Sequence, residues 1–428
     1  MNEVGEFAAE YDQKIRVEVH GRGTSALPVM KAIMDVADHP NVGVCWNSNS
    51  QDLEGEGLEY NFNLVRPRFA DTVHVRELNI GSYPYQELMD LFVATEYSGW
   101  ILLEARTKPK DRVKALIEQR KVFEAMVAKA KQNAQCTQHG VQIIKRDKKV
   151  TVNINGKLFT EYCFKDVPRP YFYPVIGPTG VPVNRHWPMR DGPGEAHDHP
   201  HHNSLWFTHG EVNGVDFWAN GDERGKVVHD KFLSIESGPK AGAIKTQNKW
   251  MTADGKTVCT DTRTHRFYDH PDGKMMDLEV TMHASHGELT FGDTKEGSMA
   301  IRLAPTMRLK GEVGKGHIVN SAGDRDDKTW GKRAAWCDYY GPVDGQVVGV
   351  AIFDHPENPR HPTWWHVRNY GLFAANPFGV HYFEKKPRGT GDLVIPAGED
   401  VTFRWRFYFH KGDEKQGKVA EHYREYAS

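Results

Sequence analysis

The sequence predicts a two-domain protein in which an α/β segment, about half of a parallel (β/α)₈ barrel, precedes a large antiparallel β-sandwich. Its 428 residues exceed what one ordinary hydrophobic core requires. Strand-like and helix-like runs first alternate regularly, and from Val141 to His410 short strand-like runs separated by Gly, Pro, Asn and Asp replace them. We therefore divide the chain into a partial barrel at 1–132, a polar linker at 133–140 and a sandwich at 141–428.

The first segment is a βα repeat. Its strand-like runs begin at residues 14, 42, 70 and 100, so successive starts are 28, 28 and 30 residues apart. This spacing is typical of parallel strands joined by crossover helices. Four units supply about half of the roughly 250 residues of a complete barrel, and a half barrel leaves sheet edges and interior open. The chain is then a fragment of a longer product, or two copies complete one barrel, or the sandwich covers the opening; we favour the fragment.

Each of the four strand-like runs carries a polar side chain at or near its C-terminal end. These residues are Glu18 with His20, then Asn47, His74 and Glu104. In parallel barrels the loops at that end converge on one pocket. Two carboxylates, an imidazole and an amide oxygen suit a divalent ion such as Mn²⁺, Mg²⁺, Co²⁺ or Zn²⁺. The sequence therefore predicts a metal site formed by Glu18, Asn47, His74 and Glu104.

The stretches EVHGRG, GVCWN, VHV and GWILLE resemble the second half of xylose-isomerase-like sugar phosphate isomerase/epimerase barrels. The resemblance implies that Glu18, His74 and Glu104 are metal ligands and that Glu18 and Glu104 transfer a proton on the substrate. Asn47 stands where that family has Asp. The lost negative charge should lower the affinity of the site for the ion, so we expect metal binding to be weak or absent. We expect no nucleotide cofactor.

The sandwich segment resembles the family labelled "methane oxygenase PmoA-like". The matching stretches include HDHPHHNSLWFTHGEVNGVDFW, KEGSMAIRLA and LVIPAGEDVTFRWRFYFHKG. The resemblance implies a β-supersandwich of the galactose-mutarotase type, a scaffold used mostly for sugars. The label itself suits a membrane methane monooxygenase subunit, which needs membrane-spanning helices that this sequence does not encode.

Five histidines lie within thirteen residues at the start of the sandwich. Besides His197 they are His199, His201, His202 and His209. Three interpretations remain open: metal ligation by His199 and His201, proton transfer on a saccharide, and a structural loop. Proton transfer makes all four of these histidines catalytic candidates.

Further charged residues in the sandwich could meet this loop. The candidates are Glu296 with Arg302, Asp338, and His366 with Arg368. Aromatic residues accompany them, and sugars stack on such rings while their hydroxyls pair with carboxylate, Arg and His. The aromatic residues are Trp206, Trp218, Trp336, Tyr339, Trp364 and Trp365.

Composition limits the partners. The formal net charge of −2 gives no large positive field, so a nucleic-acid partner is not expected. Neither a signal peptide nor an apolar span is evident, so we expect no membrane partner and a cytoplasmic location, or export if the N-terminus is truncated. We favour an enzyme acting on a small carbohydrate, with self-association to complete the half barrel. The alternatives are a non-catalytic carbohydrate-binding sandwich with a degenerate barrel, and a copper-dependent oxidase.

Overall fold

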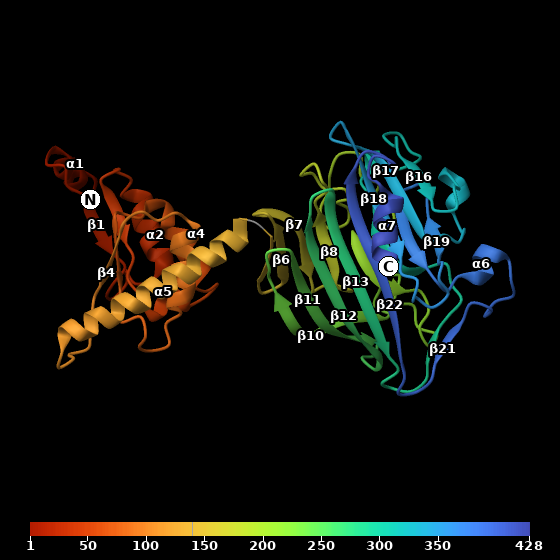
Figure 1. Ribbon diagram of the computed structural model, residues 1–428, viewed down its shortest axis with the longest axis horizontal. Coiled ribbons are helices and arrows are strands. Elements are labelled where there is room, and N and C mark those ends of the chain that lie inside the picture. The colour runs from red at the N-terminus through yellow and green to blue at the C-terminus, as the bar shows by residue number, and fades with distance from the viewer. Residues whose placement is uncertain (139) are drawn as a thin grey trace. The chain divides into compact units, whose positions relative to one another are not determined.

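The computed structural model describes residues 1–138 and 140–428 (Figure 1). The chain separates into two compact units, Met1–Gln135 and Cys136–Ser428. Their boundary falls inside 133–140, the expected linker, but the backbone there is helical as far as Gln138. This stretch contains Ala134 and two glutamines, residue types that lose little side-chain entropy in a helix. Residue 139 of the expected linker lies outside the described residues.

The first unit alternates strands and helices as the spacing predicts, and it adds one helix before the first strand. Its elements are α1 (Asn2–Glu10), β1 (Ile15–Glu18), α2 (Leu27–Val36), β2 (Val42–Cys45), η1 (Ser50–Leu53), α3 (Leu58–Val65), η2 (Arg66–Arg68), β3 (Thr72–Val75), α4 (Tyr85–Ala94), β4 (Trp100–Leu103) and α5 (Arg112–Gln138).

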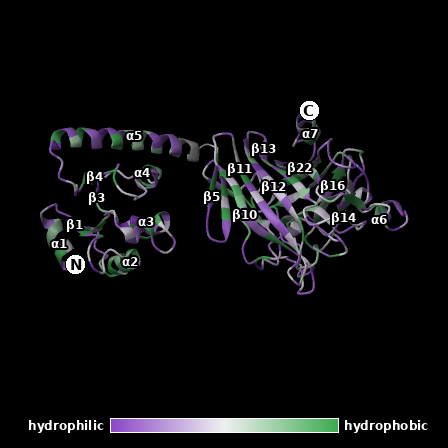
Figure 2. Ribbon diagram, turned by 90° about the horizontal axis from the view of Figure 1, so that it is seen from below, coloured by the Kyte–Doolittle hydropathy of each residue, from purple (hydrophilic) through white to green (hydrophobic). Residues whose placement is uncertain are grey.

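The four strands of this unit are parallel. β1 pairs with β2 and β3 pairs with β4. Two backbone hydrogen bonds join the pairs, from Ala70 N to Val44 O at 2.9 Å and from His74 N to Trp46 O at 2.8 Å. Figure 2 shows mostly hydrophilic residues along α5, and its Phe123 belongs to the few that pack against the unit's core. The observed arrangement is two short parallel pairs with their helices.

The second unit contains two eight-stranded antiparallel sheets. The first has the spatial order β10 (Lys226–Glu236), β11 (Ala241–Met251), β12 (Thr257–His270), β13 (Gly273–His283), β22 (Asp400–Lys411), β18 (Gln346–Asp354), β17 (Trp336–Val343) and β16 (His317–Asn320). The second has the order β19 (Trp364–Val367), β20 (Leu372–Asn376), β15 (Gly297–Arg302), β9 (Leu205–His209), β8 (Tyr171–Val175), β7 (Lys157–Cys163), β6 (Lys149–Ile154) and β5 (Val141–Lys145).

Smaller elements complete the sandwich. They are β14 (Leu289–Phe291) paired with β21 (Leu393–Ile395), the turns η3 (Pro305–Met307) and η4 (Asp326–Thr329), and the helices α6 (Val380–Glu384) and α7 (Val419–Ala427). One apolar core takes side chains from both large sheets, for example Phe207 from β9 and Trp405 from β22, whose rings are 5.8 Å apart. The second unit is therefore a β-sandwich, because alternate residues of each sheet are buried against the other sheet.

No helix in residues 1–138 or 140–428 combines the length and apolar character needed to span a bilayer.

Candidate functional site

The four residues predicted as metal ligands meet in the first unit. Glu18 ends β1, Asn47 and Glu104 follow β2 and β4, and His74 lies in β3. His74 Nδ1 is 3.0 Å from Glu18 Oε1. Asn47 Nδ2 donates hydrogen bonds to Glu18 Oε1 at 2.8 Å and to Glu104 Oε2 at 3.5 Å. The strand ends of successive parallel units thus bring four distant residues into one polar cluster.

This cluster fits a metal ion on two observations. One ligand atom from each of Glu18, His74 and Glu104 lies within 4.8 Å of the others. The Oδ1 atom of Asn47 is buried and has no hydrogen-bond partner, although a buried carbonyl oxygen ordinarily has one. The amide nitrogen of Asn47 separates the two carboxylates by donating to both, which satisfies part of the negative charge that an ion would otherwise neutralise.

In the second unit, strand alternation divides the histidine-rich segment between two faces of a sheet. Leu205 and Phe207 of β9 point into the core between the sheets. Trp206 points the other way and packs in a separate cluster with Trp218 and residues of β15 and β20. We call this opposite face, together with the loop residues His199 and His202 that stack above it, the histidine face.

Aromatic and imidazole rings form a stack on the histidine face. Tyr370 stacks on His199 at 5.2 Å and 8°, and His199 stacks on His202 at 4.7 Å and 11°. His202 in turn lies 5.4 Å from Trp206 at 24°. Trp206 is only 1% exposed, so the tryptophan forms the floor of the stack and the outer rings face the solvent side.

His199 is paired with a carboxylate that the sequence analysis did not single out. His199 Nδ1 lies 2.9 Å from Asp198 Oδ2, and the His199 side chain is 39% exposed. The two atoms do not meet hydrogen-bond geometry, so the contact is an ion pair that forms when His199 is protonated. Asp198 is fixed by Arg185 and by Arg302, whose NH2 donates to the two carboxylate oxygens at 3.0 and 3.2 Å. Burial raises the pKa of Asp198, but Arg302, His199 and Arg185 together outweigh it and hold that pKa below its usual value.

The backbone of His199 supports a functional interpretation. Its φ is +44°, in the left-handed region where a Cβ costs roughly 1–2 kcal/mol. Hydrogen bonds hold this geometry, because Arg185 NH2 donates to His199 O at 2.9 Å. Strained residues of this kind cluster at functional sites.

The other predicted histidines have different environments. His202 is 1% exposed, and its Nδ1 accepts a hydrogen bond from Arg302 NH1 at 3.0 Å. Burial first, and then His201 and Arg302, lower its pKa, so the ring is neutral. Burial and then Arg169 lower the pKa of His201 to about 4. In the part of the chain that the structure describes, the group of three or more ligand atoms close enough to hold a metal ion is Glu18, His74 and Glu104, and these histidines form no such group.

His209 is not brought to the histidine face, contrary to the prediction that grouped it with the other three. Its ring lies on the core side of β9, 4.5 Å from the ring of Phe378. Its Nε2 donates to Gly292 O at 2.8 Å, and burial lowers its pKa to about 4. The physical reason is the two-residue period of a strand, which turns residues 205, 207 and 209 to the same side.

Asp338 is also remote from the histidine face. It lies in β17 of the other sheet, where His410 Nε2 donates to its Oδ1 at 3.1 Å. Both side chains of this pair are fully buried. Asp338 is therefore half of a buried ion pair in the sandwich, and its predicted role beside the histidines has no geometric support.

Glu296, His366 and Arg368 do reach the histidine face. Glu296 forms an ion pair with Lys295. Burial is the main cause that raises the pKa of Tyr370, and the charge of Glu296 raises it further. His366 Nδ1 accepts from Trp330 Nε1 at 3.1 Å. Burial and then Arg368 lower the pKa of His366 to about 3.

Arg185, Asp198, Trp330 and Tyr370 are functional candidates that the sequence analysis missed. Asp198 sits between two histidines in HDH, so a search for His–carboxylate pairs at adjacent positions would have found it. No local signal marks Tyr370, which joins the site only through the register of β15 and β20.

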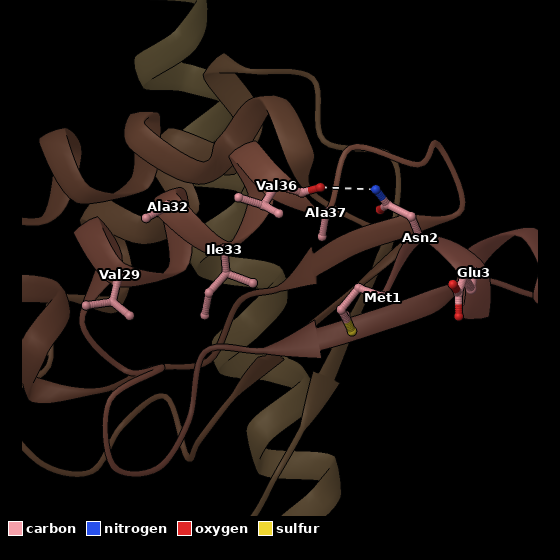
Figure 3. Close-up of a pocket in the computed structure, with 8 residues that line it drawn as sticks. All are labelled: Met1, Asn2, Glu3, Val29, Ala32, Ile33, Val36 and Ala37. Carbon is pink, nitrogen blue, oxygen red and sulfur yellow. Dashed lines mark hydrogen bonds between the residues drawn. The ribbon is translucent and has the colours of Figure 1, made fainter.

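A further hollow lies in the first unit between α1 and α2 (Figure 3). It is lined mainly by apolar side chains, including Val29, Ile33 and Val36, and Asn2 Nδ2 donates to Val36 O at 3.1 Å across it. Glu3 is the one titratable side chain among its lining residues. The hollow thus offers little acid–base or metal chemistry.

Comparison with known proteins gives one family and distant structural similarities. A family described as "Family of unknown function (DUF6807)" matches residues 149–424. No curated protein matches the chain.

Three solved structures illustrate the structural similarities. The 3-keto-D-glucoside 4-epimerase YcjR from E. coli is 16% identical over 28% of this chain and 50% of its own, with a TM-score of 0.25. Heparan sulfate lyase HepC from Pedobacter heparinus is 10% identical over 91% and 51%, with a TM-score of 0.32. A putative aldose 1-epimerase from Escherichia coli K12 is 11% identical over 64% and 99%, with a TM-score of 0.25. The chain thus spans about half the length of the first two.

Proposed function

Since the chain belongs to DUF6807, a family whose function is unknown, its activity has to be argued from its own residues, and we propose that it is a carbohydrate-active enzyme. In this proposal the second unit carries out acid–base chemistry on a saccharide at the histidine face. The observation that carries the proposal is the half-exposed His199 held against Asp198. An imidazole oriented by a carboxylate is the arrangement that general acid–base catalysis requires.

The geometry assigns a role to each partner. In this proposal the ring proton of His199 lies on Nδ1, which is 2.9 Å from Asp198 Oδ2, and Nε2 takes a proton from, or returns it to, a sugar hydroxyl or ring oxygen. Asp198 fixes this tautomer and stabilises the imidazolium that forms. Arg185 and Arg302 keep Asp198 ionised and in place.

We further propose that the first unit is the remnant of a xylose-isomerase-like half barrel whose polar cluster holds a divalent ion. Glu18, His74 and Glu104 would hold the ion, with the unpartnered Oδ1 of Asn47 as a fourth oxygen. Such an ion polarises a carbonyl or hydroxyl oxygen of a bound substrate. The residues themselves position that substrate, and Glu18 and Glu104 accept or donate its proton.

Product analysis with a panel of free sugars and glycosides tests the acid–base proposal. We expect His199→Gln and Asp198→Asn to reduce turnover about 10²- to 10⁴-fold, the factor that general acid–base groups supply. His286→Ala, which changes an exposed histidine in the same unit, is the matched control and should retain activity.

Unchanged turnover in both site variants would overturn the assignment of His199. Saccharide binding without turnover by the wild-type protein would instead favour the alternative, a non-catalytic carbohydrate-binding sandwich. That alternative has in its favour the partly exposed side chains of Tyr370 and His199, which offer a contact surface for a sugar whether or not a proton is transferred.

A further inference from the structure

Arg368 differs from Arg185 and Arg302, which also lie on the histidine face, because its side chain is not bound to a carboxylate. Its guanidinium carbon lies 5.6 Å from the ring centroid of Trp330 and 5.6 Å from that of Tyr370. Arg185 and Arg302 both bind Asp198. No group in the part of the chain that the structure describes accepts a hydrogen bond from, or forms an ion pair with, the side chain of Arg368. Its planar donors are therefore held between two rings and left unoccupied.

The nearby carboxylates are engaged by other cations. Asp327 feels the charge of Arg368, but it accepts from Lys310 Nζ at 2.5 Å and from Asn369 Nδ2 at 2.9 Å. Glu296 is bound by Lys295. Asp198 is shared by two arginines that are 1% and 2% exposed. Against these three carboxylates stand five cations, which are Arg185, Lys295, Arg302, Lys310 and Arg368.

His366 adds a neutral donor beside Arg368. Residues 364, 366 and 368 alternate with Trp365 and Val367, which point into the core, so His366 and Arg368 share the other face. Because Nδ1 of His366 accepts from Trp330, the ring proton lies on Nε2 and can be donated to an anion. A guanidinium with free parallel donors matches the geometry of carboxylate, phosphate and sulfate.

We propose that Arg368, with His366, forms an anion subsite on the histidine face, and that the saccharide recognised there carries a carboxylate, phosphate or sulfate group. This inference rests on the proposed saccharide function and specifies its substrate class. Trp330 and Tyr370 orient the guanidinium by stacking on it, and the excess of positive charge attracts the anion. The sugar ring itself would then lie toward Tyr370 and His199.

Calorimetric titration of the full chain tests the subsite, in EDTA so that the first unit holds no divalent ion. The ligands are glucuronate, glucose 6-phosphate and glucose 6-sulfate, with glucose as the neutral reference and inorganic phosphate as the free anion. We expect at least one acidic sugar to bind more tightly than glucose and than phosphate. The best of the three identifies the anionic group.

Variants separate charge from packing. Arg368→Gln should weaken the acidic sugar about 10- to 100-fold, because a charged hydrogen bond is lost, and should leave glucose binding unchanged. Arg368→Lys should weaken it less. Arg266→Gln removes one exposed arginine of the same unit and should change neither. Melting temperatures measured alongside show that each variant is folded.

Three results would overturn the subsite. They are equal weakening of glucose and acidic sugar in Arg368→Gln, equal affinity of wild type for inorganic phosphate and acidic sugar, and no binding of any acidic sugar. The proposed function fails separately: if Arg368→Gln loses acidic sugars selectively while His199→Gln turns over at the wild-type rate, the subsite stands and the acid–base assignment does not.

Discussion

At the scale of single residues, two histidines ten positions apart have different environments. His199 is 39% exposed and faces Asp198. His209 is 0% exposed and bonds to a backbone carbonyl. Exposure and the identity of the partner group therefore separate the two histidines, and only His199 is placed where it could exchange a proton with a ligand.

This contrast predicts opposite effects of substitution. His209→Ala should lower the free energy of unfolding by about 2–4 kcal/mol, because it leaves a cavity and an unpaired buried carbonyl. His199→Gly should change that free energy by less than about 1 kcal/mol, because relief of the positive φ offsets the lost stacking. Urea unfolding measures both. A large loss of stability in His199→Gly would mean that His199 is scaffold.

The environment of the Asn47 amide predicts that replacing it by a carboxylate lowers the stability of the first unit and raises its metal affinity. Asn47→Asp removes the donor to Glu18 and Glu104 and places a third carboxylate beside them. We expect the free energy of unfolding in EDTA to fall by about 1–3 kcal/mol, since like charges then meet at a buried position. Mn²⁺ affinity should rise at least tenfold by calorimetry. Glu104→Ala in the same background should remove this gain, and tight Mn²⁺ binding that survives it would exclude the site.

At the scale of elements, β9 contributes both to the core and to the histidine face. Leu205 and Phe207 pack between the sheets while Trp206 supports the ring stack. The strand can serve both purposes because successive side chains point to opposite faces. One consequence is that histidines held neutral by burial lie in or next to β9. The free energy of unfolding of the sandwich therefore depends on pH.

Acidification should therefore destabilise the sandwich. The pKa is lowered to about 4 for His201 and His209 and to about 3 for His366, with burial the largest cause in each. A histidine with a lowered folded pKa contributes stability that is present above about pH 6.5 and lost as pH falls toward the folded value. Between about pH 6.5 and 4, each of these histidines lowers the free energy of unfolding by up to about 1.4 kcal/mol for every pH unit of acidification.

Denaturant unfolding at pH 7, 6 and 5 measures this slope, and His209→Gln should reduce it.

His410 opposes the trend: burial lowers its pKa, but Asp338 outweighs burial and raises it. His410 therefore stabilises the folded state fully below about pH 6.5, and this stabilisation declines as pH rises. In Asp338→Asn we expect the loss of stability above neutral pH to be smaller. A pH-independent stability in wild type would contradict both assignments.

At the scale of the whole molecule, the first unit exposes apolar side chains that a complete barrel would cover. Trp100 and Leu102 of β4 are 72% and 44% exposed. Val36, beside the hollow in Figure 3, is 78% exposed. A soluble domain rarely leaves apolar side chains such as Trp100 and Leu102 exposed along an edge strand, or Val36 exposed on a helix.

We therefore expect the chain to self-associate through this unit. Light scattering at micromolar concentration should show a dimer or larger species, and Trp100→Glu with Leu102→Lys should shift it toward monomer. Val347→Lys, which changes a 46% exposed residue of the sandwich, is the control and should have no effect. A monomeric wild type would contradict the expectation.

The sequence by itself determined the order of elements and the cluster in the first unit. Spacing of strand starts predicted four βα units, and strand-end positions predicted that Glu18, Asn47, His74 and Glu104 would lie together. Both predictions rest on the spacing of the strands along the chain. That spacing is sufficient because parallel strands of similar length end at the same edge of a sheet. The antiparallel sandwich was predictable for the same reason, from short strands between turn residues.

Only the tertiary structure decided which residues of the sandwich meet. It joined the neighbours Asp198 and His199 to Arg302 and Tyr370, from two other segments, and it removed His209 and Asp338 from that group. The sequence could not decide this, because the partner of a side chain depends on the face of its strand and on the register between strands. A shift of one residue turns a strand's side chains to the opposite face, and that register is fixed by packing across the whole sandwich.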